Sequence, residues 1–351
     1  MNLIEKIEEL ALIGKTPNGI CREAGSKEDN LGKSLCISYM MDAGMTVRRD
    51  EWGNIIGRLD GVGAPIVTGS HTDTVPTAGK YDGALGVLAG IQAAETLRDQ
   101  LHNPLEVVIF HDEENTMSGS IGYCAERPDL TAFIELHVEQ GPVLDVERKD
   151  IGIVTGIVGQ RRNNFTLFGQ ENHAGTTPMN MRDDALVKAA SLVTYVNDFA
   201  NEMYDGLVAT VGELHVSPNS FSVIPGRVDL TLQVRDLNVD NMESFVEKIS
   251  KEFDLRYDIA HHSEPALCDP TIMYVIGDVS EDLGLKTIEM PSRASHDAQN
   301  FTWCPMGMIF VPSIGGVSHS PDEETTNEMC YNGANVLTET IRRIDGKDWA
   351  V

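Results

Sequence analysis

The chain has 351 residues, of which 41% are hydrophobic and 23% charged, and its formal net charge is −27. This length exceeds what one hydrophobic core usually organises, so we expect two domains. The negative charge repels phosphate backbones and no basic cluster offsets it, which argues against nucleic acid as a partner. No apolar run approaches the ~20 residues of a membrane span, the N-terminus lacks the pattern of a signal peptide, and the six cysteines lie far apart. We therefore expect a cytoplasmic protein with no membrane partner.

The first part of the chain, residues 1–153, alternates apolar β-rich runs with helical patterns. The β-rich runs lie at 65–69, 105–110 and 132–136, and a helix rich in alanine and leucine is predicted over 84–98. This alternation is typical of a mostly parallel sheet with crossover helices.

Between about 155 and 265 the pattern changes to strands in which apolar and polar residues alternate. Examples are 164–168 and 227–235, with helices predicted near 183–202 and 240–253. These elements predict a smaller α+β domain.

The α/β pattern then returns, with a helix near 271–283 and a buried strand at 306–311. We therefore predict an α/β, two-domain protein. A mostly parallel-sheet domain is formed by 1–154 and 266–351, and a smaller α+β domain, 155–265, is inserted in it.

Histidines and carboxylates follow the ends of several predicted strands. They are His71, the pair Glu113 and Glu114, His137 and His319. In open α/β sheets ligands bind at the carboxyl ends of strands, so we expect these side chains to converge on one crevice. Each residue alone would more often be structural or merely solvated than catalytic. Their shared position is what indicates a metal site.

Two short motifs sharpen this expectation. In His71-Thr-Asp73 the carboxylate is placed to accept the second ring N–H and fix the tautomer of a metal-bound histidine, although a surface histidine beside a loop aspartate is the ordinary alternative. Asp82-Gly83 is a routine turn dipeptide, but here it opens a long helix, where a carboxylate could bridge two metals. Adjacent Glu113 and Glu114 point in different directions, so one can bind metal while the other handles a proton.

Six segments, in chain order, resemble the hydantoinase/carbamoylase branch of the M20 metallopeptidase superfamily. They are GSHTDTVP at 69–76, YDGALGVL at 81–88, ELHVEQGP at 135–142, GIVGQRR at 156–162, NHAGTTPM at 172–179 and GGVSHSPDE at 315–323. The similarity spans nearly the whole chain. This branch includes N-carbamoyl-L-amino-acid hydrolases, allantoate amidohydrolases and β-ureidopropionases.

The resemblance implies two divalent metal ions per chain, with zinc in first place and manganese, cobalt or nickel as alternatives. The implied ligands are His71 and His137 for one ion, Glu114 and His319 for the other, and Asp82 as the bridge. Glu113 is implied as the general base, which takes a proton from a metal-bound water to give the hydroxide held between the metals. We also expect a strained, cis Asp82–Gly83 peptide.

Other implied residues belong to the inserted domain. His173 is a catalytic residue that stabilises an oxyanion, and Gln160, Asn219 and Arg227 bind substrate. The resemblance implies that 1–154 and 266–351 form the catalytic di-metal domain and that 155–265 is a lid or dimerisation domain. Because some of these residues reach the neighbouring subunit in the family, it also implies a homodimer joined through 155–265. The alternatives are that His173 caps a turn and that Arg227 is a surface charge.

The implied function is metal-dependent cleavage of the C–N bond of a ureido (N-carbamoyl) group, or a related amide, in a small carboxylate substrate. The alternatives are an M20-type N-acyl-amino-acid deacylase or dipeptidase, and an inactive binding protein that kept the fold. The chain departs from the family pattern in a shorter segment between Glu114 and Glu135, in HDEEN at 111–115, and in ASHDAQ at 294–299, where we expect His296 to give structural support.

Overall fold

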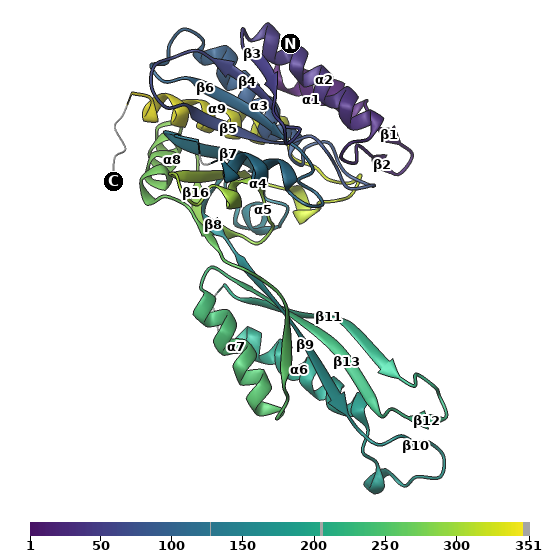
Figure 1. The fold of residues 1–351 in the computed structure, drawn as a ribbon. Helices are drawn as coiled ribbons and strands as arrows, with labels where there is room; N and C mark the ends of the chain where they lie inside the picture. The colour runs from purple at the N-terminus through teal and green to yellow at the C-terminus, as the bar shows by residue number, and fades with distance from the viewer. Residues whose placement is uncertain (127, 204–205, 347–351) are drawn as a thin grey trace. The chain divides into compact units, whose positions relative to one another are not determined.

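The chain forms two compact units, shown by the computed structural model in Figure 1. The structure describes residues 1–126, 128–203 and 206–346. The larger unit is made of Met1–Ile157 and Ala266–Val351, and the smaller unit is Val158–Pro265. The smaller unit is thus an insertion, with limits close to the 155 and 265 set by the sequence analysis.

A nine-stranded sheet forms the centre of the larger unit in the described residues, in the order β15-β8-β17-β7-β5-β6-β4-β3, with β16 paired to β8. The strands are β3 (Thr46–Arg49), β4 (Ile55–Leu59), β5 (Ile66–His71), β6 (Leu105–Phe110), β7 (Ala132–Val138), β8 (Ile151–Ile157), β15 (Ala266–Leu267), β16 (Thr287–Ser292) and β17 (Met306–Val311). Strands β17, β7, β5 and β6 are mutually parallel, whereas β3, β4 and β15 pair antiparallel. Residues that follow the four parallel strands therefore gather at one edge.

Helices cover both faces of this sheet. They are α1 (Leu3–Ala11), α2 (Lys27–Asp42), α3 (Ala84–Leu97), α8 (Pro270–Asp282) and α9 (Asn327–Ile344) on one face, and α4 (Ser118–Ala125), α5 (Val143–Glu147) and a 3₁₀ turn, η2 (Asp297–Asn300), on the other. Strands β5, β6 and β17 are consequently buried along their whole length. Burial on both faces explains why their sequences read as continuous apolar runs.

Helix α3 is the element that places Asp82, which directly precedes it. Its residues Ala84, Leu85 and Val87 are fully buried, and it packs against β5, β6, β7 and α9. A Cβ added at Gly86 would lie 2.2 Å from the Leu136 carbonyl oxygen, so this helix contacts β7 through its own backbone. The start of α3 is therefore held firmly against the strands that carry the histidines.

The smaller unit is a four-stranded antiparallel sheet with the order β11-β13-β9-β14. Its elements are β9 (Gly159–Phe168), β10 (Asn172–His173), η1 (Met179–Met181), α6 (Ala185–Met203), β11 (Val208–Ser217), β12 (Val223–Ile224), β13 (Arg227–Asp236), α7 (Val239–Glu252) and β14 (Tyr257–Ser263). Alternate residues of β9 and β13 are buried in a core shared with α6 and α7, and the opposite face of the sheet is polar. The short strands β10 and β12 pair as a separate ribbon.

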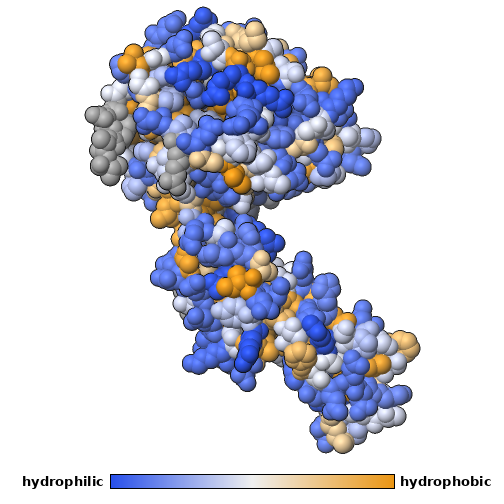
Figure 2. Space-filling model, viewed as in Figure 1, coloured by the Kyte–Doolittle hydropathy of each residue, from blue (hydrophilic) through white to orange (hydrophobic). Residues whose placement is uncertain are grey.

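Hydrophilic residues predominate on the face of the protein shown in Figure 2. Among the described residues, no helix is both long and apolar enough to cross a membrane. All six cysteines are free thiols, and four of them are buried.

Candidate metal centre

The predicted metal ligands meet at the carboxyl edge of the parallel strands in the larger unit. His71 is the last residue of β5, His137 lies in β7, and Glu114 follows β6. His319 lies beyond β17, after the 3₁₀ turn η3 (Ile314–Gly316). Asp82 stands before α3, among the other four.

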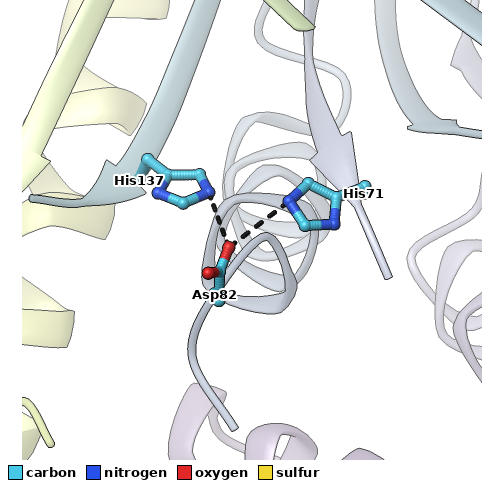
Figure 3. A group of neighbouring side chains, drawn as sticks. All are labelled: His71, Asp82 and His137. Carbon is cyan, nitrogen blue, oxygen red and sulfur yellow. Dashed lines mark ion pairs between the residues drawn. The ribbon is translucent and has the colours of Figure 1, made fainter. Parts of the chain in front are cut away.

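Two groups of possible ligands share Asp82, and each uses a different oxygen of its carboxylate. Asp82 Oδ1 lies 3.4 Å from His71 Nε2 and 3.2 Å from His137 Nε2 (Figure 3). Asp82 Oδ2 lies 3.4 Å from His319 Nε2, which is itself 3.5 Å from Glu114 Oε2. This is the arrangement that a carboxylate bridging two cations requires.

The donor atoms fit two divalent cations. Ligands bound tetrahedrally at about 2.1 Å lie about 3.4 Å apart, close to the separations found here. In addition, Glu114 Oε1 is buried with no hydrogen-bond partner among the described residues, as expected of an atom that serves an ion. The N–H of Gly83 donates to the lone pair of His137 Nε2 at 3.1 Å. A cation bound to His137 would use that lone pair, so this hydrogen bond must break when the cation binds.

Backbone carbonyl groups orient the two buried histidines. His71 Nδ1 lies 2.9 Å from the carbonyl oxygen of Asp73, and His137 Nδ1 lies 2.9 Å from that of Val138. A proton on each Nδ1 leaves Nε2 as the ligand atom. The sequence analysis was wrong about the atom of Asp73, since its carboxylate lies 4.0 Å from His71 Nδ1 and instead accepts the N–H of Glu114.

The expected cis peptide at Asp82–Gly83 was also wrong. In the described residues the recorded cis bond joins Ser217 and Pro218. Gly83 instead adopts a left-handed φ of 61°, and a Cβ there would lie 2.5 Å from the His71 ring. Glycine is therefore required at this position because of both its backbone angle and the space available.

Glu113 belongs to neither ligand group but stands beside them. Its Oε2 is 3.5 Å from His71 Nε2, and only 8% of the residue is exposed. Burial, with the negative charges of Asp297 and Glu114, raises the pKa of Glu113 well above its usual range despite the opposing charge of His71. Asp82 behaves differently, because its interactions with His137, His319 and His71 overcome the effect of burial and hold its pKa well below the usual range.

Sequence reasoning missed two residues that hold Asp82. Gln140 Nε2 donates to Asp82 Oδ2 at 2.7 Å, and Glu323 Oε1 accepts the N–H groups of Tyr81 and Asp82. Both lie inside quoted motifs, but only the fold brings them to Asp82. His296 is buried and its ring centroid lies 4.5 Å from that of His137, in the supporting position that the sequence analysis assigned to it.

The implied substrate residues all lie in the smaller unit and fall into two places. Arg227 begins β13 opposite Ser217, Asn219 lies two residues beyond the end of β11 with a φ of 55°, and His173 is exposed in β10. Gln160 stands near the start of β9, whose other end pairs with Arg227. From Gln160 to that end β9 rises about 26 Å at ~3.3 Å per residue. One small substrate cannot contact Gln160 and Arg227 of the same smaller unit.

Comparison with known proteins identifies the family. The sequence profile of peptidase family M20/M25/M40 matches residues 67–343. The chain is 35% identical over 397 aligned positions to the N-carbamoyl-L-amino acid amidohydrolase of Geobacillus stearothermophilus, covering 97% of each chain. It is 33% identical to the allantoate amidohydrolase of Bacillus subtilis, covering 98% of this chain and 97% of the relative. A crystal structure of an amidase of the hydantoinase/carbamoylase family from Burkholderia multivorans superposes with a TM-score of 0.88 at 34% identity, covering 98% and 97%.

The chain therefore belongs to peptidase family M20/M25/M40, in its hydantoinase/carbamoylase branch. It is a hydrolase of carbon–nitrogen bonds other than peptide bonds. The alignment with the Geobacillus relative is longer than this chain, so that relative contains internal segments absent here. In this protein the segment between Glu114 and β7 forms only the short helix α4 among its described residues.

Proposed function

We propose that this protein hydrolyses the C–N bond of a ureido (N-carbamoyl) group in a small substrate that carries a carboxylate. The main support for the proposal is that the two carboxylate oxygens of Asp82 face two different groups of possible metal ligands. The carboxylate of Glu113 lies beside these groups and belongs to neither of them. Two divalent ions, zinc foremost, would be held by His71, His137, Asp82, Glu114 and His319. When bound they would polarise the scissile carbonyl and lower the pKa of the attacking water.

Glu113 is the general base in this proposal. Because burial raises the pKa of its carboxyl group, Glu113 is a stronger base than an exposed glutamate and can accept a proton from water and later release it. It then delivers the proton to the departing nitrogen. Its position next to His71, outside both ligand groups, leaves its oxygens available for this transfer.

His173 is suited to donate a hydrogen bond to the developing oxyanion. Its Nδ1 accepts the N–H groups of Gly175 at 3.0 Å and Thr176 at 3.2 Å, so the ring proton must lie on Nε2. An exposed Nε2–H with its tautomer fixed in advance is a preorganised donor. His173 can therefore cap this turn through Nδ1 and still donate a hydrogen bond to the oxyanion through Nε2.

Arg227 is the proposed partner of the substrate carboxylate, with Asn219 beside it. Its Nε and Nη2 each donate to Asp229 at 2.8 Å, and the guanidinium lies over the ring of Phe168. These contacts fix the plane of the guanidinium and leave the Nη1 edge directed away from Asp229. A second carboxylate could bind along that edge through two parallel hydrogen bonds.

The separation of Gln160 from Arg227 supports a homodimer joined through residues 155–265. If both residues contact one substrate, they must come from different chains. Gln160 would then come from one protomer, and His173, Asn219 and Arg227 from its partner.

A substrate panel tests the proposed function. The relatives are named for N-carbamoyl-L-amino acids and for allantoate, so the panel should hold N-carbamoyl, ureido, N-acetyl and dipeptide compounds. Each compound is assayed after loading with zinc, manganese, cobalt or nickel. We expect N-carbamoyl or ureido substrates to give the highest kcat/KM. A clear preference for N-acetyl or dipeptide substrates would assign the protein to the deacylase or peptidase alternative.

A further inference from the structure

The side chain of Glu323 accepts hydrogen bonds from the backbone of the loop that carries Asp82. Its Oε1 accepts the N–H of Tyr81 at 2.8 Å and the N–H of Asp82 at 3.1 Å. Glu323 is only 5% exposed. A Cβ added at Gly79 would lie 2.4 Å from Glu323 Cβ, so the loop approaches this side chain as closely as glycine permits.

The same residue belongs to the loop that carries His319. Both residues lie between β17 and α9, and the N–H of Glu323 donates to the carbonyl of Ser320 at 3.1 Å. A single carboxylate oxygen therefore ties the backbone beside Asp82 to the segment that presents His319. These are two ligands of the second metal group, although they come from distant parts of the sequence.

Fixing that backbone matters because Asp82 must serve two groups at once. A rotation that improves the contact of Oδ1 with His71 and His137 moves Oδ2 relative to His319. Gln140 and Ser318 hold the carboxylate itself, at 2.7 and 3.3 Å from Oδ2. Once the Cα position is also fixed, only two side-chain torsions of Asp82 remain, and both oxygens can be placed together.

We propose that Glu323 is a positioning residue that sets the bridging geometry of Asp82 through the two backbone N–H groups it accepts. This inference rests on the proposed two-metal function. A residue that merely filled space would affect stability but would not act selectively on the coordination of the metals. One carboxylate oxygen that accepts two successive backbone N–H groups restrains both peptide units of the loop.

The test uses cobalt, because the visible absorption of Co²⁺ reports its coordination geometry without turnover. Full-length wild type and Glu323→Ala are loaded with Co²⁺, and metal content, absorption spectrum, kcat and KM are measured. We expect Glu323→Ala to show an altered spectrum and weaker binding of one ion, with kcat lowered about 10- to 100-fold and KM little changed. An unchanged spectrum and kcat in a folded Glu323→Ala protein would overturn the inference.

Two further variants separate the acceptor from the bulk of the side chain. Glu323→Gln keeps an oxygen that can accept both N–H groups, so we expect it to keep the wild-type spectrum and most of kcat. A loss equal to that of Glu323→Ala would overturn the acceptor role. Glu324→Ala is the matched control, because that neighbouring residue is exposed, and it should leave both spectrum and kcat unchanged.

If Glu323→Ala does not fold, Gly79→Ala takes its place. That variant keeps the carboxylate but pushes the loop away from it, so it should alter the cobalt spectrum in the same direction. A wild-type spectrum in folded Gly79→Ala would overturn the inference. Wild type that binds fewer than two cobalt ions would instead overturn the proposed function itself, and the inference with it.

Discussion

The two units hold their functional residues in opposite ways. In the larger unit His71, Asp82 and His137 are at most 5% exposed, and each is fixed by the sheet, by α3 or by a backbone carbonyl. Of the five predicted ligands, His319 is exposed. In the smaller unit His173 and Arg227 are exposed. Backbone N–H groups of the following turn orient His173, and Asp229 and Phe168 orient Arg227.

This contrast indicates different tasks. The buried group can be complete within one chain, because everything that it must bind is a small ion. The exposed group consists of donors whose tautomer and orientation are fixed by neighbouring residues of the smaller unit. Because Gln160 and Arg227 of one unit lie too far apart for one small substrate, we propose that the exposed group completes the site of a partner.

The largest expected effect follows removal of the shared ligand. Asp82→Ala should lose both metals and reduce turnover on the order of 10⁴-fold, because each ligand group loses a donor. Metal content measured after dialysis, together with kcat, checks this. A variant that kept two ions and wild-type turnover would show that Asp82 is not the bridge.

The next effect separates the adjacent glutamates. Glu113→Gln should keep both metals and bind substrate but lose about 10²–10⁴-fold in kcat, as is usual when a general base is removed. Glu114→Gln should instead lose one metal. Comparing metal content in the two variants decides the assignment. Loss of metal from Glu113→Gln, with retention in Glu114→Gln, would reverse the two roles.

In the exposed group the expected effects are smaller. Arg227→Lys should lower kcat/KM for carboxylate substrates about 10- to 100-fold, because lysine cannot form two parallel hydrogen bonds. A carboxamide analogue should lose little. Asp229→Asn is a useful companion variant, since it weakens the pair that orients Arg227 without touching the guanidinium. Equal losses on the acid and the amide would place Arg227 outside the carboxylate site.

The interface proposal is tested by mixing two inactive proteins. Glu113→Gln chains mixed with His173→Ala chains should recover about a quarter of the wild-type activity, because half of the dimers are hybrids with one intact site each. Mixing Glu113→Gln with Asp82→Ala provides the control, since both lesions lie in the larger unit and no hybrid site is intact. No recovery after confirmed subunit exchange would place His173 in its own chain's site, or outside catalysis.

The sequence predicted the fold well wherever periodicity and burial agree. The helices predicted at 84–98, 240–253 and 271–283 match α3, α7 and α8 to within a residue at each end. The apolar residues that gave the helical periodicity are the ones that pack in the core of each unit. The strand ends that carry the histidines were also predicted, because parallel strands must finish at one edge.

Details of the site that depend on the meeting of distant loops could not be predicted in this way. Glu323 accepts a hydrogen bond from the backbone of Asp82, which lies 241 residues earlier in the chain. Gln140 reaches Asp82 because its backbone has a φ of 60°, and nothing in the sequence indicates that conformation. The orienting atom of Asp73 was predicted as the carboxylate because a sequence shows side chains, whereas the structure uses the backbone carbonyl. The distance between Gln160 and Arg227 followed only from the register of β9 with β13.

The smallest expected effect concerns stability, and it again separates the two units. Hydrogen bonds and charge from Asp82 raise the pKa of His319, and burial raises the pKa of Glu323 to about 7. Burial opposes protonation of His71, but the charge of Glu113 and the hydrogen bond to Asp82 raise its pKa well above the ordinary value. Without metal, the native larger unit therefore binds more protons near neutral pH than the unfolded chain does.

The sign of the effect follows from that excess. A group whose pKa is raised on folding contributes stability below its unfolded pKa and loses it as the pH rises through the folded value. Between pH 6.5 and 8.5 the metal-free protein should thus become less stable by about 1.4 kcal/mol per pH unit for each excess proton. Metal ions need the same ligands deprotonated, so the loaded protein should show the opposite trend or none. Thermal denaturation of chelator-treated and reloaded protein across this range provides the measurement. If stability varied with pH in the same way with and without metal, the metal ligands would not be the groups that hold the excess protons. That result would contradict the proposed contrast between a proton-binding metal centre and an exposed substrate surface.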